Sequence, residues 1–236
     1  MFATGITWFS FSYALGINCL FCGVLKGAPT LIKAERPSPL IVYVQEKLAP
    51  AISYIEKVQI MTGLILPYKK TMPIVANDTF IAPNATVIGD VVIGAESGIW
   101  FNCLLRGDVN EIRIGERTNI QDGSVVHVSG QGQGTYIGND ITIGHMALIH
   151  ACTLENGCFI GMNATVMDGC VVESGAMVAA GALVPPGKRV LAGQIWGGTP
   201  ARYLRDIREA DLQTISYTVP HYVKLAHRYR NGLAQK

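Results

Sequence analysis

The sequence predicts an all-β core built as a left-handed parallel β-helix, with a C-terminal α-helix after it and a helical, partly membrane-associated extension before it. Three observations predict this fold: aliphatic residues recur every six positions in the middle of the chain, glycine is abundant, and the N-terminal stretches are apolar without that period. The expected organisation is an apolar and amphipathic extension over residues 1–72, the β-helix over 73–200 and the C-terminal helix over 201–236.

The composition excludes several classes of protein. Hydrophobic residues make up 49% and charged residues 15% of the 236 positions, so the chain is not a disordered one. A net charge of +2 favours neither nucleic acid nor another strongly charged partner. The six cysteines are scattered, and only Cys19 and Cys22 form a C-x-x-C pair. This is not the disulfide framework of a secreted protein, and it fits a reducing or organellar interior.

The first uncharged stretch covers residues 6–25, which is just long enough to span a bilayer. Its serine, threonine, asparagine and glycine residues fit an interfacial helix, or a helix buried against a partner, equally well. Arginine is absent before Arg36, unlike in a typical transit peptide, and a secretory signal would begin with basic residues. The stretch is therefore expected to belong to the mature protein.

A second apolar stretch, residues 39–66, has the spacing of an amphipathic helix bent at Pro50. Such a helix packs either on its own domain or on a membrane or larger assembly. The second interpretation is favoured because the β-helix that follows looks complete without it. The apolar positions are Ile41, Val44, Leu48, Ile52, Ile55 and Val58.

The six-residue period begins at Ile81 and persists, with short interruptions, to Val184. The position four residues after each aliphatic residue is small or compact. The aliphatic positions are Ile81, Val87, Ile93, Ile99, Leu105, Ile114, Ile120, Val126, Ile137, Ile143, Ile149, Leu154, Ile160, Val166, Val172, Val178 and Val184. The compact positions are Ala85, Val91, Ser97, Cys103, Thr118, Ser124, Ala147, Cys158, Ala164, Cys170, Ala176 and Ala182.

A period of six fits neither a simple helix nor a flat sheet, but it fits a solenoid in which each hexad supplies one short strand and one turn. Three hexads close a triangular coil, and successive coils stack as parallel strands. The aliphatic residue points inward and the compact residue lets the corner close. Cys103, Cys158 and Cys170 occupy compact inward positions, so they are expected to be core residues without chemistry of their own.

The period is lost near the C-terminus. From Glu209 the apolar residues have helical spacing, and Pro220 predicts a kink. We expect a C-terminal helix packed along the triangular prism. The apolar positions are Leu212, Ile215, Val219, Val223 and Ala226.

Three of the five histidines fall within the period of six. His127 and His150 each follow an inward aliphatic residue, so both side chains should point outward, whereas His145 lies near the preceding corner. His145 and His150 then occupy adjoining sides of the prism, roughly 10 Å or more apart at ~3.3 Å per strand residue. Zinc requires nitrogen ligands at about 2.0–2.1 Å, so a single chain should not bring both to one ion.

Two chains packed side by side around a threefold axis can bring His145 of one chain to His127 and His150 of its neighbour. Three imidazoles with an open fourth position are typical of a catalytic metal site. An ordinary polar contact remains the alternative for any single histidine.

Three stretches resemble the γ-class carbonic anhydrase family: "RGDVNEIRIGERTNIQDGSVVHV" (106–128), "IGHMALIHACTLENGCFIGMNATV" (143–166) and "AGQIWGGTPARYLR" (192–205). The resemblance runs from about residue 73 to residue 208. It implies a trimer of left-handed β-helices with metal at the subunit interfaces. By resemblance, the metal ligands are His127, His145 and His150, and Gln121 holds and orients the reacting water. Arg106 and Asp108 match an intersubunit ion pair, and Asp122 a supporting polar residue.

The chemistry that the resemblance implies is zinc-dependent hydration of carbon dioxide to bicarbonate, although iron or cobalt also suits three imidazoles. Fully active members carry a glutamate directly after "RGD" and a glutamate-bearing loop beyond the first histidine. Here Val109 and the acid-free "SGQGQG" (129–134) stand in those places. A metal-binding structural subunit without turnover is therefore the second hypothesis. A hexapeptide acyltransferase is the third, and it is disfavoured because acyl transfer needs one base and an acyl-carrier groove rather than three histidines.

The apolar N-terminal extension resembles those of mitochondrial γ-carbonic anhydrase subunits of respiratory complex I. This resemblance implies a homo- or heterotrimer with related chains on the matrix side of the inner membrane. Partners would be membrane-arm subunits of complex I, and the N-terminal segment would contact lipid.

Overall fold

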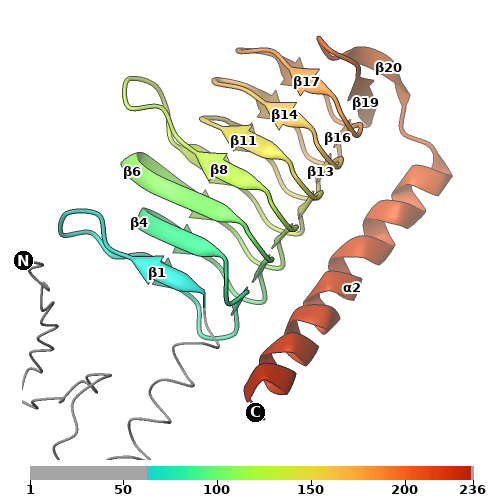
Figure 1. Ribbon diagram of the computed structural model, residues 1–236. Helices are drawn as coiled ribbons and strands as arrows, with labels where there is room; N and C mark the ends of the chain where they lie inside the picture. The colour runs from blue at the N-terminus through green and yellow to red at the C-terminus, as the bar shows by residue number, and fades with distance from the viewer. Residues whose placement is uncertain (1–62, 235–236) are drawn as a thin grey trace, which may run out of the picture. The chain divides into compact units, whose positions relative to one another are not determined.

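The computed structural model describes residues 63–234, which form a left-handed parallel β-helix followed by one long helix, α2 (Glu209–Ala234) (Figure 1). The hexads close into triangular coils as predicted. Every aliphatic position of the period is buried, and so is every compact corner position, including Cys103, Cys158 and Cys170. One continuous core therefore runs along the inside of the prism.

The strands form a 12-stranded and an 8-stranded sheet, which together make the three sides of the prism. β4 (Thr86–Ile93) and β6 (Leu104–Ile114) are long enough to turn a corner, because each pairs with strands on two sides. The first side consists of the first halves of β4 and β6 together with β1 (Leu64–Leu66), β8 (Val125–His127), β11 (Leu148–His150), β14 (Thr165–Val166) and β17 (Leu183–Val184).

The second side consists of the second halves of β4 and β6 together with β2 (Ile74–Val75), β9 (Thr135–Ile137), β12 (Thr153–Leu154), β15 (Val171–Val172) and β18 (Arg189–Val190). The third side is the 8-stranded sheet: β3 (Phe80–Ile81), β5 (Gly98–Ile99), β7 (Asn119–Ile120), β10 (Thr142–Ile143), β13 (Phe159–Ile160), β16 (Met177–Val178), β19 (Gln194–Gly197) and β20 (Arg202–Asp206). All pairs are parallel except β19 with β20, which is antiparallel and ends the solenoid.

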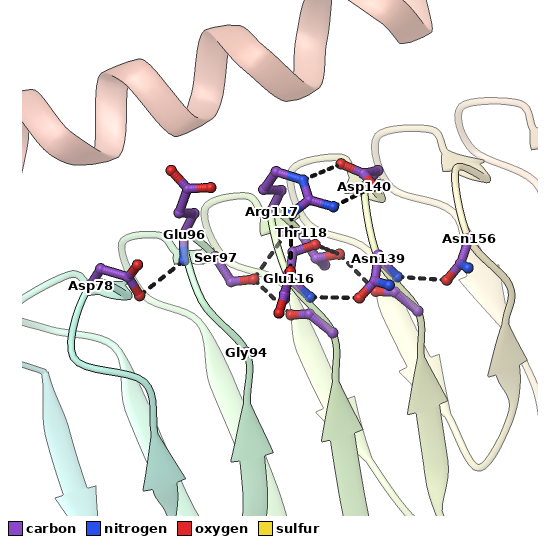
Figure 2. A network of polar contacts seen from close by, with 12 residues as sticks. Asp78, Gly94, Glu96, Ser97, Glu116, Arg117, Thr118, Asn139, Asp140 and Asn156 are labelled. Carbon is purple, nitrogen blue, oxygen red and sulfur yellow. Dashed lines mark hydrogen bonds and ion pairs between the residues drawn. The ribbon is translucent and has the colours of Figure 1, made fainter.

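A row of side-chain hydrogen bonds links successive coils at the corner between the second and third sides (Figure 2). The Ser97 hydroxyl donates to Gly115 O at 2.8 Å, and Thr118 repeats this one coil later by donating to Gly138 O at 2.8 Å. Further along, Asn156 Oδ1 accepts from the Asn139 N–H at 2.8 Å. These contacts satisfy turn groups that the strand ladders leave unpaired.

α2 runs back along the third side of the prism and contacts β3, β5, β7 and β10 (Figure 1). Its aromatic residues pack on those of the sheet: Trp100 and Tyr222 lie edge to face with ring centroids 5.1 Å apart. Near its C-terminal end, Arg230 donates to Asp78 O and Asn77 O, both at 2.8 Å. The predicted C-terminal helix along the prism is confirmed, and Pro220 lies inside it without ending it.

Two expected boundaries differ from the structure. The sheet begins before residue 73, because Leu64–Leu66 pairs in register with β4, so residues 64–66 do not belong to the amphipathic helix expected over 39–66. The C-terminal helix begins at Glu209 rather than at residue 201, because residues 202–206 pair with β19 instead. The expected membrane-associated segment over 6–25, and the rest of the extension before residue 63, lie outside the described residues. Between residues 63 and 234, no helix is long and apolar enough to cross a membrane.

Candidate metal centre

His127 and His150 lie next to each other at the edge between the first and second sides. They end β8 and β11, and these strands pair so that His150 stands directly opposite His127. Both follow a buried aliphatic residue and point outward, as the period of six predicts. His127 Nδ1 and His150 Nε2 face each other at 3.1 Å.

A carboxylate occupies the outer nitrogen of each of these imidazoles. Asp108 Oδ1 lies 3.2 Å from His127 Nε2, and Asp168 Oδ1 lies 2.6 Å from His150 Nδ1. The four side chains come from successive coils, in the vertical order Asp108, His127, His150, Asp168. We call this set the histidine column.

Asp108 also pairs with Arg106 within the chain. Burial alone would raise the pKa of Asp108, but the hydrogen bonds from Arg106 and His127 outweigh it and hold that pKa below its usual value. Asp108 is therefore an anion, and its carboxylate can accept the Nε2–H of His127. The expected ion pair of Arg106 and Asp108 between subunits stays a prediction.

His145 lies at the opposite edge of the first side, in the turn that precedes β11, whereas His150 ends that strand. Its Nδ1 is 2.8 Å from Asp122 Oδ2, so Asp122 does for His145 what Asp108 and Asp168 do for the other two histidines. In each of the three pairs, a carboxylate takes one ring nitrogen and leaves the other for a further partner.

Gln121 and His145 share a shallow groove between this edge and α2, whose lining also includes Met162 and Tyr222. Gln121 is buried, and its amide donates to Asn119 Oδ1 at 3.1 Å. Asn119 in turn donates to Thr142 Oγ1 at 3.0 Å. These contacts fix the Gln121 amide beside His145.

The described residues of one chain bring two of the three predicted ligands together, not all three. His127 and His150 are adjacent, and no group of three or more metal-ligating side chains is assembled within residues 63–234. The pair nevertheless fits a tetrahedral ion, since two nitrogens at 2.0–2.1 Å from such an ion lie about 3.3 Å apart. The observed separation of 3.1 Å is close to that value.

The surface between these two edges is largely apolar. Outward-facing residues of the first side stack in a ladder through the strand pairs, and Leu64 and Leu148 are among the exposed large hydrophobic residues. The ladder consists of Leu64, Thr86, Leu104, Val125, Leu148, Thr165 and Leu183. An apolar strip with a histidine at each edge is suited to packing against another chain.

The positions at which the resemblance noted above leads one to expect acids are uncharged here. Val109 is 51% exposed, next to the loop over residues 129–134. Asn110 closes this loop by donating to Ser129 O at 3.1 Å. The edge beside the histidine column thus has no carboxylate at Val109 or in the loop.

Sequence reasoning missed Asp168 and Asn119. The signal for Asp168 was its distance of 18 residues from His150, which is one coil of three hexads and places it directly next to that histidine. Asn119 lies two residues before Gln121, on the same face of the chain, and alternation along a strand places such residues together.

Comparison with known proteins supports the same family. Residues 151–186 match the model described as bacterial transferase hexapeptide (six repeats). The chain is 51% identical over 162 residues to "Gamma carbonic anhydrase 1, mitochondrial" of Arabidopsis thaliana, covering 66% of this chain and 59% of that one. It is 48% identical over 152 residues to "Probable carbonic anhydrase" of Methanocaldococcus jannaschii, covering 64% of this chain and 95% of that one.

The chain belongs to the γ-class carbonic anhydrase family. A solved hexapeptide transferase family protein from Anaplasma phagocytophilum has the same fold, with a TM-score of 0.68 and 44% identity over 70% of this chain and 98% of that one. The matched region spans 59% of the length of the first Arabidopsis thaliana relative, which is less than two thirds of that protein.

Proposed function

We propose that this chain is a γ-carbonic anhydrase-like subunit that completes its metal site only together with a neighbouring chain. In this proposal, His127 and His150 of one chain hold zinc together with His145 of the partner subunit. The observation that carries the proposal is the pair of facing nitrogens of His127 and His150, 3.1 Å apart, at one edge of an apolar side. His145, at the other edge of that side, pairs with Asp122, and within residues 63–234 it belongs to no group of three or more metal-ligating side chains.

When bound by three imidazoles with an open fourth position, zinc supplies a Lewis acid that makes hydroxide available near neutral pH. The proposed reaction is the reversible hydration of carbon dioxide to bicarbonate. Gln121 holds and orients the reacting water, and the exposed Met162 gives the groove an apolar wall suited to carbon dioxide. Iron and cobalt also suit these ligands.

The first experiment compares His145→Ala with His221→Ala in the full chain. His221 lies on α2, and its ring stacks on Tyr217, so its loss leaves the proposed site intact. Metal analysis is expected to find about one zinc per chain in the wild type and in His221→Ala, and almost none in His145→Ala. Stopped-flow hydration of carbon dioxide should fall at least about a hundredfold in His145→Ala. Full metal content and an undiminished rate in His145→Ala would refute the proposal.

A complementation experiment tests whether the site is shared between chains. His127→Ala and His145→Ala are each expected to lack metal when expressed alone. Random mixed trimers of the two variants rebuild one site wherever an intact His127 meets an intact His145, so about a quarter of the wild-type zinc should return. A site built within one chain would regain nothing on mixing.

Neither position 109 nor the loop over 129–134 carries an acidic side chain that could move the proton from the site to solvent, so this proton transfer is expected to be slow. If the chain turns over, its rate should rise with the concentration of imidazole buffer, because a soluble base then carries the proton. Zinc content without any hydration, at every buffer concentration, would instead identify a structural subunit that binds metal without turnover.

We further propose that the protein is located in mitochondria, on the matrix side of the inner membrane, as a complex I membrane-arm subunit in a homo- or heterotrimer of related chains. Support comes from the Arabidopsis thaliana relatives, whose names contain "mitochondrial", and from the uncharged N-terminal stretch over residues 6–25, which is proposed to contact lipid. Native gels of mitochondrial membranes should show the protein comigrating with complex I. Migration only as a free soluble trimer would refute this assignment.

A further inference from the structure

The histidine column assigns a role to Asp168, the carboxylate that sequence reasoning did not identify. Asp168 Oδ1 lies 2.6 Å from His150 Nδ1, which is a shorter contact than the 3.2 Å between Asp108 and His127. Hydrogen bonds with an ionised partner are the short and strong ones. The contact therefore restrains the ring of His150 more tightly than that of His127.

The turn that carries Asp168 is itself held from both sides. The backbone carbonyl of Asp168 accepts a hydrogen bond from the Gly187 N–H at 2.8 Å. The N–H of the next residue, Gly169, donates to Ala151 O at 2.8 Å. Gly169 adopts a positive φ of 69°, and the side chain of Cys170 is buried in the core immediately after it. The turn that contains Asp168 is thus hydrogen-bonded to the preceding and the following coil. These bonds fix the position of the Asp168 carboxylate relative to His150.

The column leaves the two inner nitrogens facing each other. If His127 and His150 are neutral and each donates its outer N–H to a carboxylate, the two inner nitrogens, 3.1 Å apart, both present lone pairs. Two facing lone pairs repel each other unless a proton or a cation lies between them. The arrangement therefore leaves Nε2 of His150 as an acceptor for a proton or a cation.

We propose that Asp168 is the positioning residue of His150: it accepts the Nδ1–H, fixes that tautomer and leaves Nε2 to bind the metal. This inference rests on the proposed function for the identity of the ion, but not for the tautomer. Hydrogen-bonded partners of metal-binding histidines typically change metal affinity 10–100-fold when they are replaced.

The test compares Asp168→Ala, Asp168→Asn and the control Asp140→Asn in the full chain. Asn keeps an acceptor oxygen at the same reach, whereas Ala removes it. Asp140 is an equally exposed aspartate that pairs with Arg117 at another corner. Zinc affinity, measured by competition with a chelator, should fall about 10–100-fold in Asp168→Ala, fall less in Asp168→Asn and stay unchanged in Asp140→Asn. Wild-type zinc affinity in Asp168→Ala would overturn the proposal.

A second readout does not need the metal. In metal-free protein labelled with ¹⁵N-histidine, NMR should find the proton of neutral His150 on Nδ1 in the wild type, and a shift toward Nε2 in Asp168→Ala. A wild-type His150 protonated on Nε2 would equally overturn the assignment. If instead the wild type binds no zinc yet shows the Nδ1–H tautomer lost in Asp168→Ala, the proposed function fails while the positioning contact stands. Because Asp168→Asn changes only one atom of the side chain, it guards against a variant that fails to fold.

Discussion

Buried thiols occupy the corner positions that the period of six reserves for compact residues. Cys103, Cys158 and Cys170 are confirmed as core residues, and Cys152 is buried as well. Burial raises the pKa of the Cys103 thiol to about 12, because the thiolate would lose its hydration in the core. The same cause raises the pKa of the Cys152, Cys158 and Cys170 thiols.

These four thiols are predicted to be inert in the folded protein, because the reactive species is the thiolate and the core admits neither charge nor reagent. In native protein at pH 8, iodoacetamide followed by mass spectrometry should find Cys103, Cys152, Cys158 and Cys170 unmodified. All four should become modified after unfolding in urea. Rapid modification of any one of them without unfolding would contradict its place in the core.

At the residue scale, the sequence predicted which side chains point inward and which point outward, because strand alternation is a local property. It therefore placed His127 and His150 outward correctly. The hydrogen-bond partners are harder to predict, because they come from the neighbouring coil. Asp168 could be found only by counting 18 residues from His150. The inserted loop between β8 and β9 breaks that count elsewhere, as in the 23 residues between His127 and His150.

At the scale of the element, close stacking of the coils explains two glycines with opposite requirements. A Cβ at Gly161 would lie 2.4 Å from Ala180 N and 2.7 Å from Ala179 C, which are backbone atoms of the next coil. A Cβ at Gly157 would meet nothing within 4 Å, but this glycine has a φ of +68°. At Gly161 the lack of space requires glycine, whereas at Gly157 the left-handed backbone conformation does.

Gly161→Ala is predicted to destabilise the protein by about 3 kcal/mol, because two stacked corners of the solenoid must separate to admit the methyl group. Gly157→Ala, the matched control, should cost only about 1–2 kcal/mol, the usual penalty for a left-handed non-glycine residue. Urea unfolding at one fixed protein concentration measures both. Equal losses in the two variants would argue against the tight stacking at Gly161.

The beginning of α2 is stabilised by Asp211. Its carboxylate accepts from Arg205 at 2.6 Å and from the N–H of Arg208, the residue just before the helix, at 2.8 Å. The second contact, from the N–H of Arg208 to the side chain three residues later, is one of the two hydrogen bonds of a capping box. The hydrogen bond from Arg205, followed by that from Arg208, lowers the pKa of Asp211 from 3.8 to about 2.

A lowered pKa in the folded state means that the ionised form of Asp211 favours folding. Its contribution is predicted to be complete above pH 3.8 and to disappear as the pH falls toward 2. The difference in Tm between the wild type and Asp211→Asn should therefore be constant near neutral pH and should shrink in strong acid. Glu209→Gln, which removes the same charge from the same turn, is the control. A difference that does not change with pH would refute the pairing.

The boundaries of the elements were less predictable than their existence. The helix was recognised from its apolar spacing beginning at Glu209, but β20 was missed because residues 202–206 become a strand only through pairing with β19. β1 was missed for a similar reason, since its three residues gain their partners from β4. Strands this short are defined by their neighbours, and the sequence alone does not reveal those neighbours.

At the scale of the whole molecule, the apolar ladder on the first side is the surface proposed to pack against a second chain. Leu148 lies near its middle, between Val125 and Thr165, and is 37% exposed. Leu148→Asp is predicted to prevent assembly, because a buried unpaired carboxylate is costly at an interface. Analytical ultracentrifugation should find monomers that bind little zinc.

The control for this variant is Ile74→Asp on the second side of the prism. Ile74 is 67% exposed and belongs to no part of the proposed interface. Ile74→Asp should assemble and bind zinc as the wild type does. Trimers of Leu148→Asp, or monomers of Ile74→Asp, would show that the wrong side has been assigned.

Chain length is tolerated unequally around the prism. The extra residues between β8 and β9 leave through an outward loop, so His150 still stands opposite His127 although 23 residues separate them. Residues added at such an edge only lengthen the detour. One residue removed within β8 or β11, by contrast, would turn an imidazole from the surface into the core. Insertions, whether they arise in evolution or by the addition of a tag, should therefore be tolerated best in outward loops such as the one between β8 and β9.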